Sequence, residues 1–405
     1  MSKYINVCTL YILIWCMYIM QGALGFEGTT LSQSLLLVGI IMSIYYFFYS
    51  HSKYKLPKYF KALDLLLGLF TAYGVFHIIK GGNTVMLNYG GQILRIVPNY
   101  YYLKDIYISL LPIYAFFVFG KKKLLNETTI KTWTCIFIPI VIFLYFSNYQ
   151  RLLFQALEIG SVQEEFTNNV SYMFISLFPA LVFFRKKPLV QYILLTIFLS
   201  FILMSMKRGT ILIAFICFLV FIYETYKSTG KRDKWLFVVF IMLIFLYYLS
   251  EELLQTSEYF NYRISETLEG NSSHRDILYS RLAYFYFNEA NPVQIIFGSG
   301  ADATLKVVGQ YAHNDWLEIA VNQGVCGIIV YLVYWIFFYK SFKNVNKKDP
   351  IYIALRLILI IYFMSTLFSM SYNTIPIFST LALGYCMSNI KQGKQDTQIV
   401  KVTRI

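Results

Sequence analysis

The sequence predicts an all-α integral membrane protein with about twelve transmembrane helices and a long extracytoplasmic loop between spans nine and ten. Composition is the first reason: 58% of the 405 residues are hydrophobic and 14% are charged, whereas soluble domains carry about 25% charged residues. The mean hydropathy of +0.55 is the second. The third is that the apolar residues gather in runs, most of them near the roughly 17–25 residues that an apolar helix needs to cross a bilayer.

The predicted spans follow one another with short connections over most of the chain. Their ranges are 4–23, 31–50, 62–79, 105–120, 132–149, 168–184, 189–206, 210–226, 235–250, 316–339, 351–370 and 376–390. The first run is about 20 residues long and no A-x-A cleavage site follows it, so we expect a retained helix and not a signal peptide.

The longest connection divides the chain into four parts. Spans one to nine occupy residues 1–250, the extracytoplasmic loop 251–315, spans ten to twelve 316–390, and a basic cytoplasmic tail 391–405. The loop is too small for an independent domain, and we expect it to form short helices over the membrane face. Its segment Tyr279 to Phe287 is typical of an interfacial amphipathic or re-entrant helix.

The net charge of +14 is explained by membrane topology. Most of the 35 Lys and Arg residues lie in one alternate set of connections, which includes 51–61, 121–131, 340–348 and the tail. Because cytoplasmic loops of membrane proteins are enriched in Lys and Arg, we predict that both termini are cytoplasmic. No nucleic-acid partner is needed to account for the charge.

Metal and cofactor chemistry has no support in the sequence. All six Cys residues lie in predicted spans, without the spacing of metal ligands or an extracellular pair. We expect them to be buried hydrophobic residues, and we expect no cofactor.

The most informative stretch runs from Tyr311 to Gly327. Asp315 as N-cap and Glu318 at the third helical position have the spacing of a capping box, and Gly324 and Gly327 are expected to clear one helix face for close packing. This interpretation leaves His313 unexplained.

The stretch resembles the signature of the bacterial O-antigen ligase and polymerase family, the Wzy/WaaL-type membrane glycosyltransferases. His313-Asn314, nine residues, Gly324, two residues and Gly327 carry the resemblance. Other family elements are matched in the same order and on the same predicted side, by Arg275-Asp276-Ile277-Leu278-Tyr279, by Phe297-Gly298-Ser299-Gly300 after Pro292, and by the basic turn Lys207-Arg208. The family often has a small residue before its Arg, whereas His274 precedes Arg275 here, so Arg281 is an alternative match.

The resemblance implies transfer of a glycan from an undecaprenyl-diphosphate carrier to an acceptor hydroxyl, at the outer face of a bacterial plasma membrane. Arg suits the diphosphate because its guanidinium offers a fork of donors. The implied catalytic residues are Arg208, Arg275 and His313, of which His313 activates or orients the acceptor. Lys207, Arg281, Asn314 and Glu318 are implied substrate contacts, and Glu318 is also a candidate to orient His313. Asn314 alternatively holds the helix start.

Three functions remain open at this point. A polymerase joins lipid-linked repeat units into O-antigen or capsule, and we favour it because polymerases specific to individual glycans are far more numerous. A ligase moves the finished polymer to lipid A-core. A flippase of lipid-linked oligosaccharide belongs to another class and predicts charges deep in several helices and broken helices at the midplane. Expected partners are the lipid-linked donor and acceptor and membrane lipid, with a flippase and a chain-length regulator as further candidates.

Overall fold

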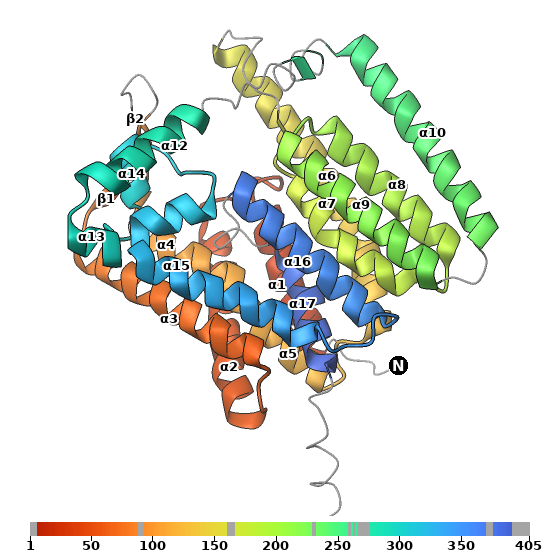
Figure 1. The fold of residues 1–405 in the computed structure, drawn as a ribbon, viewed down its shortest axis with the longest axis horizontal. Helices are drawn as coiled ribbons and strands as arrows, with labels where there is room; N and C mark the ends of the chain where they lie inside the picture. Colours follow the sequence, from red (N-terminus) through yellow and green to blue (C-terminus); the bar gives the residue numbers. More distant parts are fainter. Residues whose placement is uncertain are drawn as a thin grey trace, which may run out of the picture.

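Helices dominate the computed structural model, which describes residues 6–87, 93–159, 167–228, 232–257, 261, 264–265, 275–369 and 376–390. Within these residues, eight helical segments are long and apolar enough to cross a membrane, and one antiparallel hairpin is the only sheet (Figure 1). The predicted fold class is confirmed in this coarser form, an all-α protein with the helices of a multi-pass membrane protein. The predicted tail 391–405 lies outside the described residues.

The N-terminal group of elements ends at residue 121. It comprises α1 (Val7–Met20), α2 (Thr30–Lys53), α3 (Lys58–Ile79), β1 (Asn83–Leu87), β2 (Ile93–Pro98), α4 (Tyr100–Leu110) and α5 (Pro112–Lys121). Pro112 begins α5, where a missing backbone N–H is tolerated, so α4 and α5 together form one segment of span length. The strands β1 and β2 pair with Val85 opposite Ile96.

The middle group of helices lies side by side on the right of Figure 1. It comprises α6 (Glu127–Ile159), α7 (Ser171–Leu177), the 3₁₀ helix η1 (Phe178–Phe184), α8 (Pro188–Met204), α9 (Arg208–Ser228) and α10 (Arg232–Thr256). The outermost helix, α10, packs against α8.

The C-terminal helices join the two groups. The elements here are α12 (Arg275–Tyr284), the π-helical turn η2 (Phe285–Glu289), α13 (Pro292–Phe297), α14 (Ala303–Val308), α15 (Asp315–Phe342), α16 (Pro350–Phe368) and α17 (Ile377–Asn389). Helix α15 packs on α3 of the first group, α16 packs on α9 and η1 of the second, and α17 packs on α5. Where α3 ends and α15 begins, the hairpin and α12 to α14 gather over the helix ends (Figure 1).

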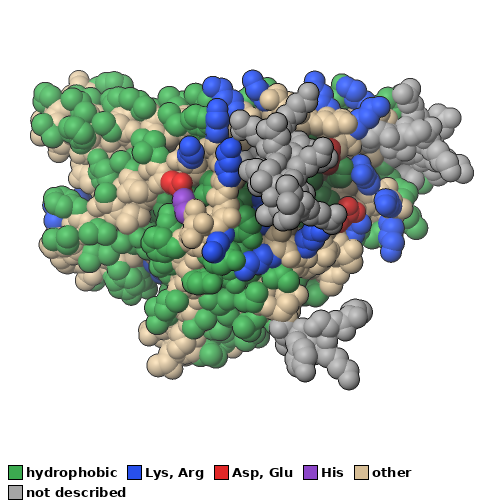
Figure 2. Space-filling view, turned by 90° about the horizontal axis from the view of Figure 1, so that it is seen from below, with side chains coloured by type: hydrophobic (Ala, Val, Ile, Leu, Met, Phe, Trp, Pro, Cys, Tyr) green, Lys and Arg blue, Asp and Glu red, His purple; other side chains and the backbone are tan. Residues whose placement is uncertain are grey.

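Apolar side chains cover much of the outer surface as well as the core. On α2, Leu37, Ile41 and Phe48 share a face and are 55–65% exposed, as expected of a helix that faces lipid. Inside, aromatic side chains such as Tyr11 and Trp15 are buried. Seen from below, Lys and Arg side chains form groups between hydrophobic areas (Figure 2).

Helix occupies each of the twelve predicted ranges, and the lengths differ. The apolar helices Val7–Met20, Ser171–Phe184 and Pro188–Met204 are shorter than the eight long segments, and α17 has 13 residues. The number twelve therefore stays a prediction, as do the sidedness and the extracytoplasmic loop. Parts of that loop form the predicted short helices α12, α13 and α14.

Candidate active site

A small apolar cluster holds the short helices against the start of α15. Leu278 and Leu282 of α12 pack with Ala303 of α14 and with Ala312 and Val321 at the α15 end, all of them buried. The cluster therefore brings the first residue of α12, Arg275, to the same end of the molecule as His313.

The cap of α15 differs from the predicted capping box. Asn314, and not Asp315, is the N-cap, because its side-chain oxygen accepts from the backbone N–H groups of Trp316 (3.0 Å) and Leu317 (3.1 Å). Asn314 therefore holds the helix start, one of the two roles that the sequence left open for it. The prediction of a reciprocal Asp315–Glu318 box is wrong, because Glu318 binds other partners.

Glu318 is a buried anchor for the loop that carries His313. Its carboxylate is fully buried and accepts hydrogen bonds from the Ala312 backbone N–H (2.8 Å), the Asn322 side chain (2.9 Å) and the Thr304 hydroxyl. Because Ala312 directly precedes His313, Glu318 acts on the position of His313 through the backbone. We therefore expect Glu318 to position the loop, and its predicted contact with a substrate stays a prediction.

His313 adopts a backbone conformation that is uncommon for a residue with a side chain. Its φ of 50° lies in the left-handed region, and its carbonyl accepts from the Tyr279 hydroxyl at 3.4 Å. Left-handed residues other than Gly cost about 1–3 kcal/mol and cluster at functional sites. This conformation sets the position of His313 immediately before the start of α15.

Two of the predicted cations act on this imidazole. The pKa of His313 is lowered to about 4, first by loss of water where protein packs around the ring and then by the positive charges of Arg275 and Lys207. His313 is therefore neutral at pH 7 and able to accept a proton. Three segments that lie far apart in the sequence meet here, at the starts of α9, α12 and α15.

The turn before α9 presents Lys207 and Arg208. Met206, like His313, is left-handed, with a φ of 54°, and the Lys207 carbonyl accepts from the Thr210 hydroxyl at 2.8 Å. Arg208 is the first residue of α9, and at Gly209 a side chain would meet Phe368 at 3.0 Å. The turn is thus packed tightly against the end of α16, at the same end of the molecule.

Arg281 is engaged elsewhere. Its guanidinium makes a two-pronged ion pair with Glu289, at 2.5 and 3.1 Å. It also lies about 120° around α12 from Arg275, because successive residues turn by about 100°. Of the two alternative matches, Arg275 is therefore the one whose charge acts on His313.

Gly324 interrupts α15, where the sequence predicted only a face cleared for packing. Its φ of 67° and ψ of −161° are non-helical, and a Cβ there would lie 2.5 Å from the Gly298 nitrogen. The loop after α13 enters this break: Ser299 N–H donates to the Val321 carbonyl (2.8 Å) and Gly300 N–H to the Asn322 carbonyl (3.0 Å). The two glycine elements that carry the resemblance thus meet each other.

The glycine contact leads to a stability prediction. Gly324→Ala should lower the free energy of unfolding by more than about 2 kcal/mol, because the backbone conformation suits Gly alone and the new methyl group overlaps Gly298. Thermal unfolding in detergent measures it. Gly68→Ala is the matched control, since Gly68 is helical with nothing within 4 Å, and it should be neutral or slightly stabilising. Equal effects of the two changes would contradict the tight contact.

Two features of the site were missed from the sequence. Tyr279 is half-buried. Burial raises its pKa, although the neighbouring Arg275 and Asn314 act to lower it. Its position four residues after Arg275, on the same helix face, was a usable signal. The second is the buried pair of His77 and Asp302, at 3.5 Å, which ties α3 to the loop before α14.

A cavity of about 1120 Å³ lies at the other end of α15, around Lys340. A helix of 28 residues separates that end from His313, a distance of about 40 Å.

Comparisons with known proteins found no similar protein family, curated protein or solved structure.

Proposed function

We propose that this chain is a membrane glycosyltransferase. It polymerises undecaprenyl-diphosphate-linked repeat units into O-antigen or capsule at the outer face of a bacterial plasma membrane. The observation that carries the proposal is the meeting of Arg275 and Lys207 with an uncharged His313 at one end of apolar, membrane-length helices. The proposal also rests on the sequence resemblance described above.

The chemistry follows from the charges. A bond forms between the acceptor hydroxyl oxygen and the anomeric carbon of the donor, and the bond from that carbon to the diphosphate oxygen breaks. His313 accepts the hydroxyl proton, and undecaprenyl diphosphate leaves with the bonding electrons. Arg208 and Arg275, with Lys207, stabilise the negative charge of this leaving group. We propose that these cations provide the charge that a metal ion supplies in other transferases.

Transport of lipid-linked oligosaccharide is the second candidate, because α15 is broken at Gly324. In transporters with broken helices, freed carbonyls and helix ends bind the substrate or the coupling ion. In α15 the carbonyls of Val321 and Asn322 already accept hydrogen bonds from the inserted loop. This engagement favours transfer over transport.

The two arginines of α12 should differ in importance. Arg275→Gln should reduce polymer formation by about 10²–10³-fold, the usual loss for one donor that stabilises a developing charge. Arg281→Gln should change it little, because its fork binds Glu289. The amount of surface polymer at matched protein abundance measures both changes. A larger loss from Arg281→Gln would show that the alternative match is the functional one.

The glycan of a deletion strain distinguishes the candidate functions. A single repeat unit on the normal anchor is expected of a lost polymerase. Finished polymer retained on the lipid carrier would instead indicate a ligase. Lipid-linked units held at the cytoplasmic face would indicate a flippase and would overturn the proposal.

A further inference from the structure

An apolar groove runs along the outside of α15 and α16. It has a volume of about 530 Å³, and its wall includes Trp335, Ile336, Tyr339, Leu359 and Phe363. Ile336 is 47% exposed and Tyr339 55% exposed, so this wall faces the surroundings of the helices. Both helices are among the membrane-length segments, which makes lipid the medium at this surface. At one end, Lys340 and Lys343 complete the wall.

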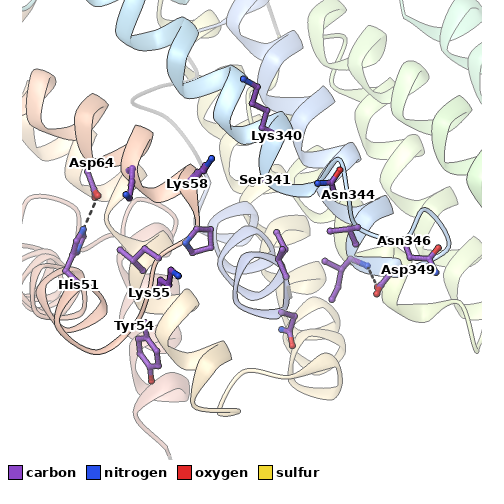
Figure 3. A pocket seen from close by; sticks show the side chains of 17 residues that line it. His51, Tyr54, Lys55, Lys58, Asp64, Lys340, Ser341, Asn344, Asn346 and Asp349 are labelled. Atoms are coloured by element: carbon purple, nitrogen blue, oxygen red, sulfur yellow. Dashed lines mark hydrogen bonds and ion pairs between the residues drawn. The ribbon is translucent and has the colours of Figure 1, made fainter. Parts of the chain in front are cut away.

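A basic cavity of about 1120 Å³ adjoins the same end of α15 (Figure 3). Its cationic side chains come from two parts of the chain far apart in sequence. They are Lys55, Lys58, Lys61 and Lys340.

The two acids in the cavity wall are occupied by partners of their own. Asp64 accepts from the Tyr114 hydroxyl at 2.5 Å and lies 3.0 Å from His51, the pair joined by a dashed line in Figure 3. Asp349 caps α16 by accepting from the Ile351 N–H at 2.9 Å. Among the described residues, no carboxylate lies within ion-pair distance of Lys58, Lys61 or Lys340. The cavity therefore favours an anion.

Lys340 lines both hollows, so the apolar groove and the basic cavity both reach one side chain. We propose that this junction binds an anionic phospholipid. An acyl chain occupies the groove, and the phosphate lies among Lys340, Lys343 and the lysines of the cavity. A free phosphate compound would leave the groove without a ligand, whereas an uncharged lipid would leave the cations without one. Charge and apolar surface together select a lipid with a negative head group.

This site lies at the opposite end of α15 from His313 and does not depend on the proposed function. Bound lipid there would fill the gap between the two helices that join the halves of the molecule, α15 and α16. We therefore expect it to stabilise the arrangement of the helices.

Fluorescence of Trp335 reports on occupancy of the groove. The full chain is reconstituted into phosphatidylcholine vesicles in two series. One series contains increasing fractions of phosphatidylglycerol brominated on an acyl chain. The other contains increasing fractions of phosphatidylcholine brominated in the same way. The Trp335 signal is the difference between wild type and Trp335→Phe. Brominated phosphatidylglycerol should quench this signal at a lower mole fraction than brominated phosphatidylcholine. Each lysine that contacts the lipid should lower the required mole fraction about fivefold.

Lysine variants test the charge requirement. The double change Lys340→Gln with Lys343→Gln should abolish the preference for phosphatidylglycerol. Lys186→Gln with Lys347→Gln removes the same charge from exposed positions that line neither hollow, and the preference should remain. Equal quenching of the wild type by both lipids would overturn the proposal. It would do so whether or not inorganic phosphate binds the detergent-solubilised chain through these lysines.

Discussion

His313→Asn should lower the rate of glycan transfer by about 10²–10⁴-fold while leaving the fold intact. The expected loss is that of a positioned general base. Asn is the informative replacement because it tolerates left-handed backbone better than most residues, and His313 has a φ of 50°. The variant therefore removes the imidazole and keeps the loop. Polymer length and amount on a gel, at equal membrane abundance of the protein, give the result.

The pH dependence of transfer follows from the same residue. With the pKa of His313 at about 4, the base is neutral above that pH, so the rate should fall only as the pH drops through about 4. An unperturbed His would lose activity near its ordinary value of about 6.5. Arg275→Gln removes a charge that disfavours imidazolium, so its remaining activity should fall off at a higher pH than that of the wild type. If the activity of Arg275→Gln fell off at the same pH as that of the wild type, the effect of the Arg275 charge on His313 would be contradicted.

Arg208→Ala should abolish detectable polymer. Arg208 begins α9 at the site end, where its guanidinium is proposed to bind the diphosphate that leaves. Charge-assisted, two-pronged hydrogen bonds to phosphate are among the strongest polar contacts in proteins. The expected loss is about 10²–10³-fold or more in the rate, measured as lipid-linked units consumed by membranes of each strain.

Arg208→Lys separates charge from geometry. Lys restores the positive charge without the planar fork, so we expect partial recovery only. Full recovery would argue against two-pronged phosphate binding. Normal polymer from Arg208→Ala would remove Arg208 from the site altogether.

The helices were predictable because apolar runs of this length have few alternatives. The same is true of the start of α15, where a polar cluster precedes an apolar run. The N-cap itself was misplaced by one residue, since Asn314 and Asp315 are both good caps and only the structure shows that Glu318 is bound by Ala312, Thr304 and Asn322. Short-range patterns cannot distinguish a capping box from a buried carboxylate that binds a distant loop.

The periodicity of apolar residues in the sequence could not predict contacts between distant parts of the chain. Nothing in the spacing of Gly324 indicates that a loop from residue 298 fills its break, because the two positions approach only after α13 folds back onto α15. The engagement of Arg281 by Glu289 was similarly hidden, since eight residues and a π-helical turn separate them. Helix geometry alone, however, places Arg281 on a different face from Arg275.

Elongation by the purified chain tests the central claim most directly. Lipid-linked repeat units extracted from the deletion strain are added to proteoliposomes that contain wild type or His313→Asn. We predict that wild type converts them to longer lipid-linked chains and releases one undecaprenyl diphosphate for each bond formed, and that the variant does neither. Units that cross the bilayer without becoming longer, and without release of undecaprenyl diphosphate, would contradict glycosyl transfer and establish transport.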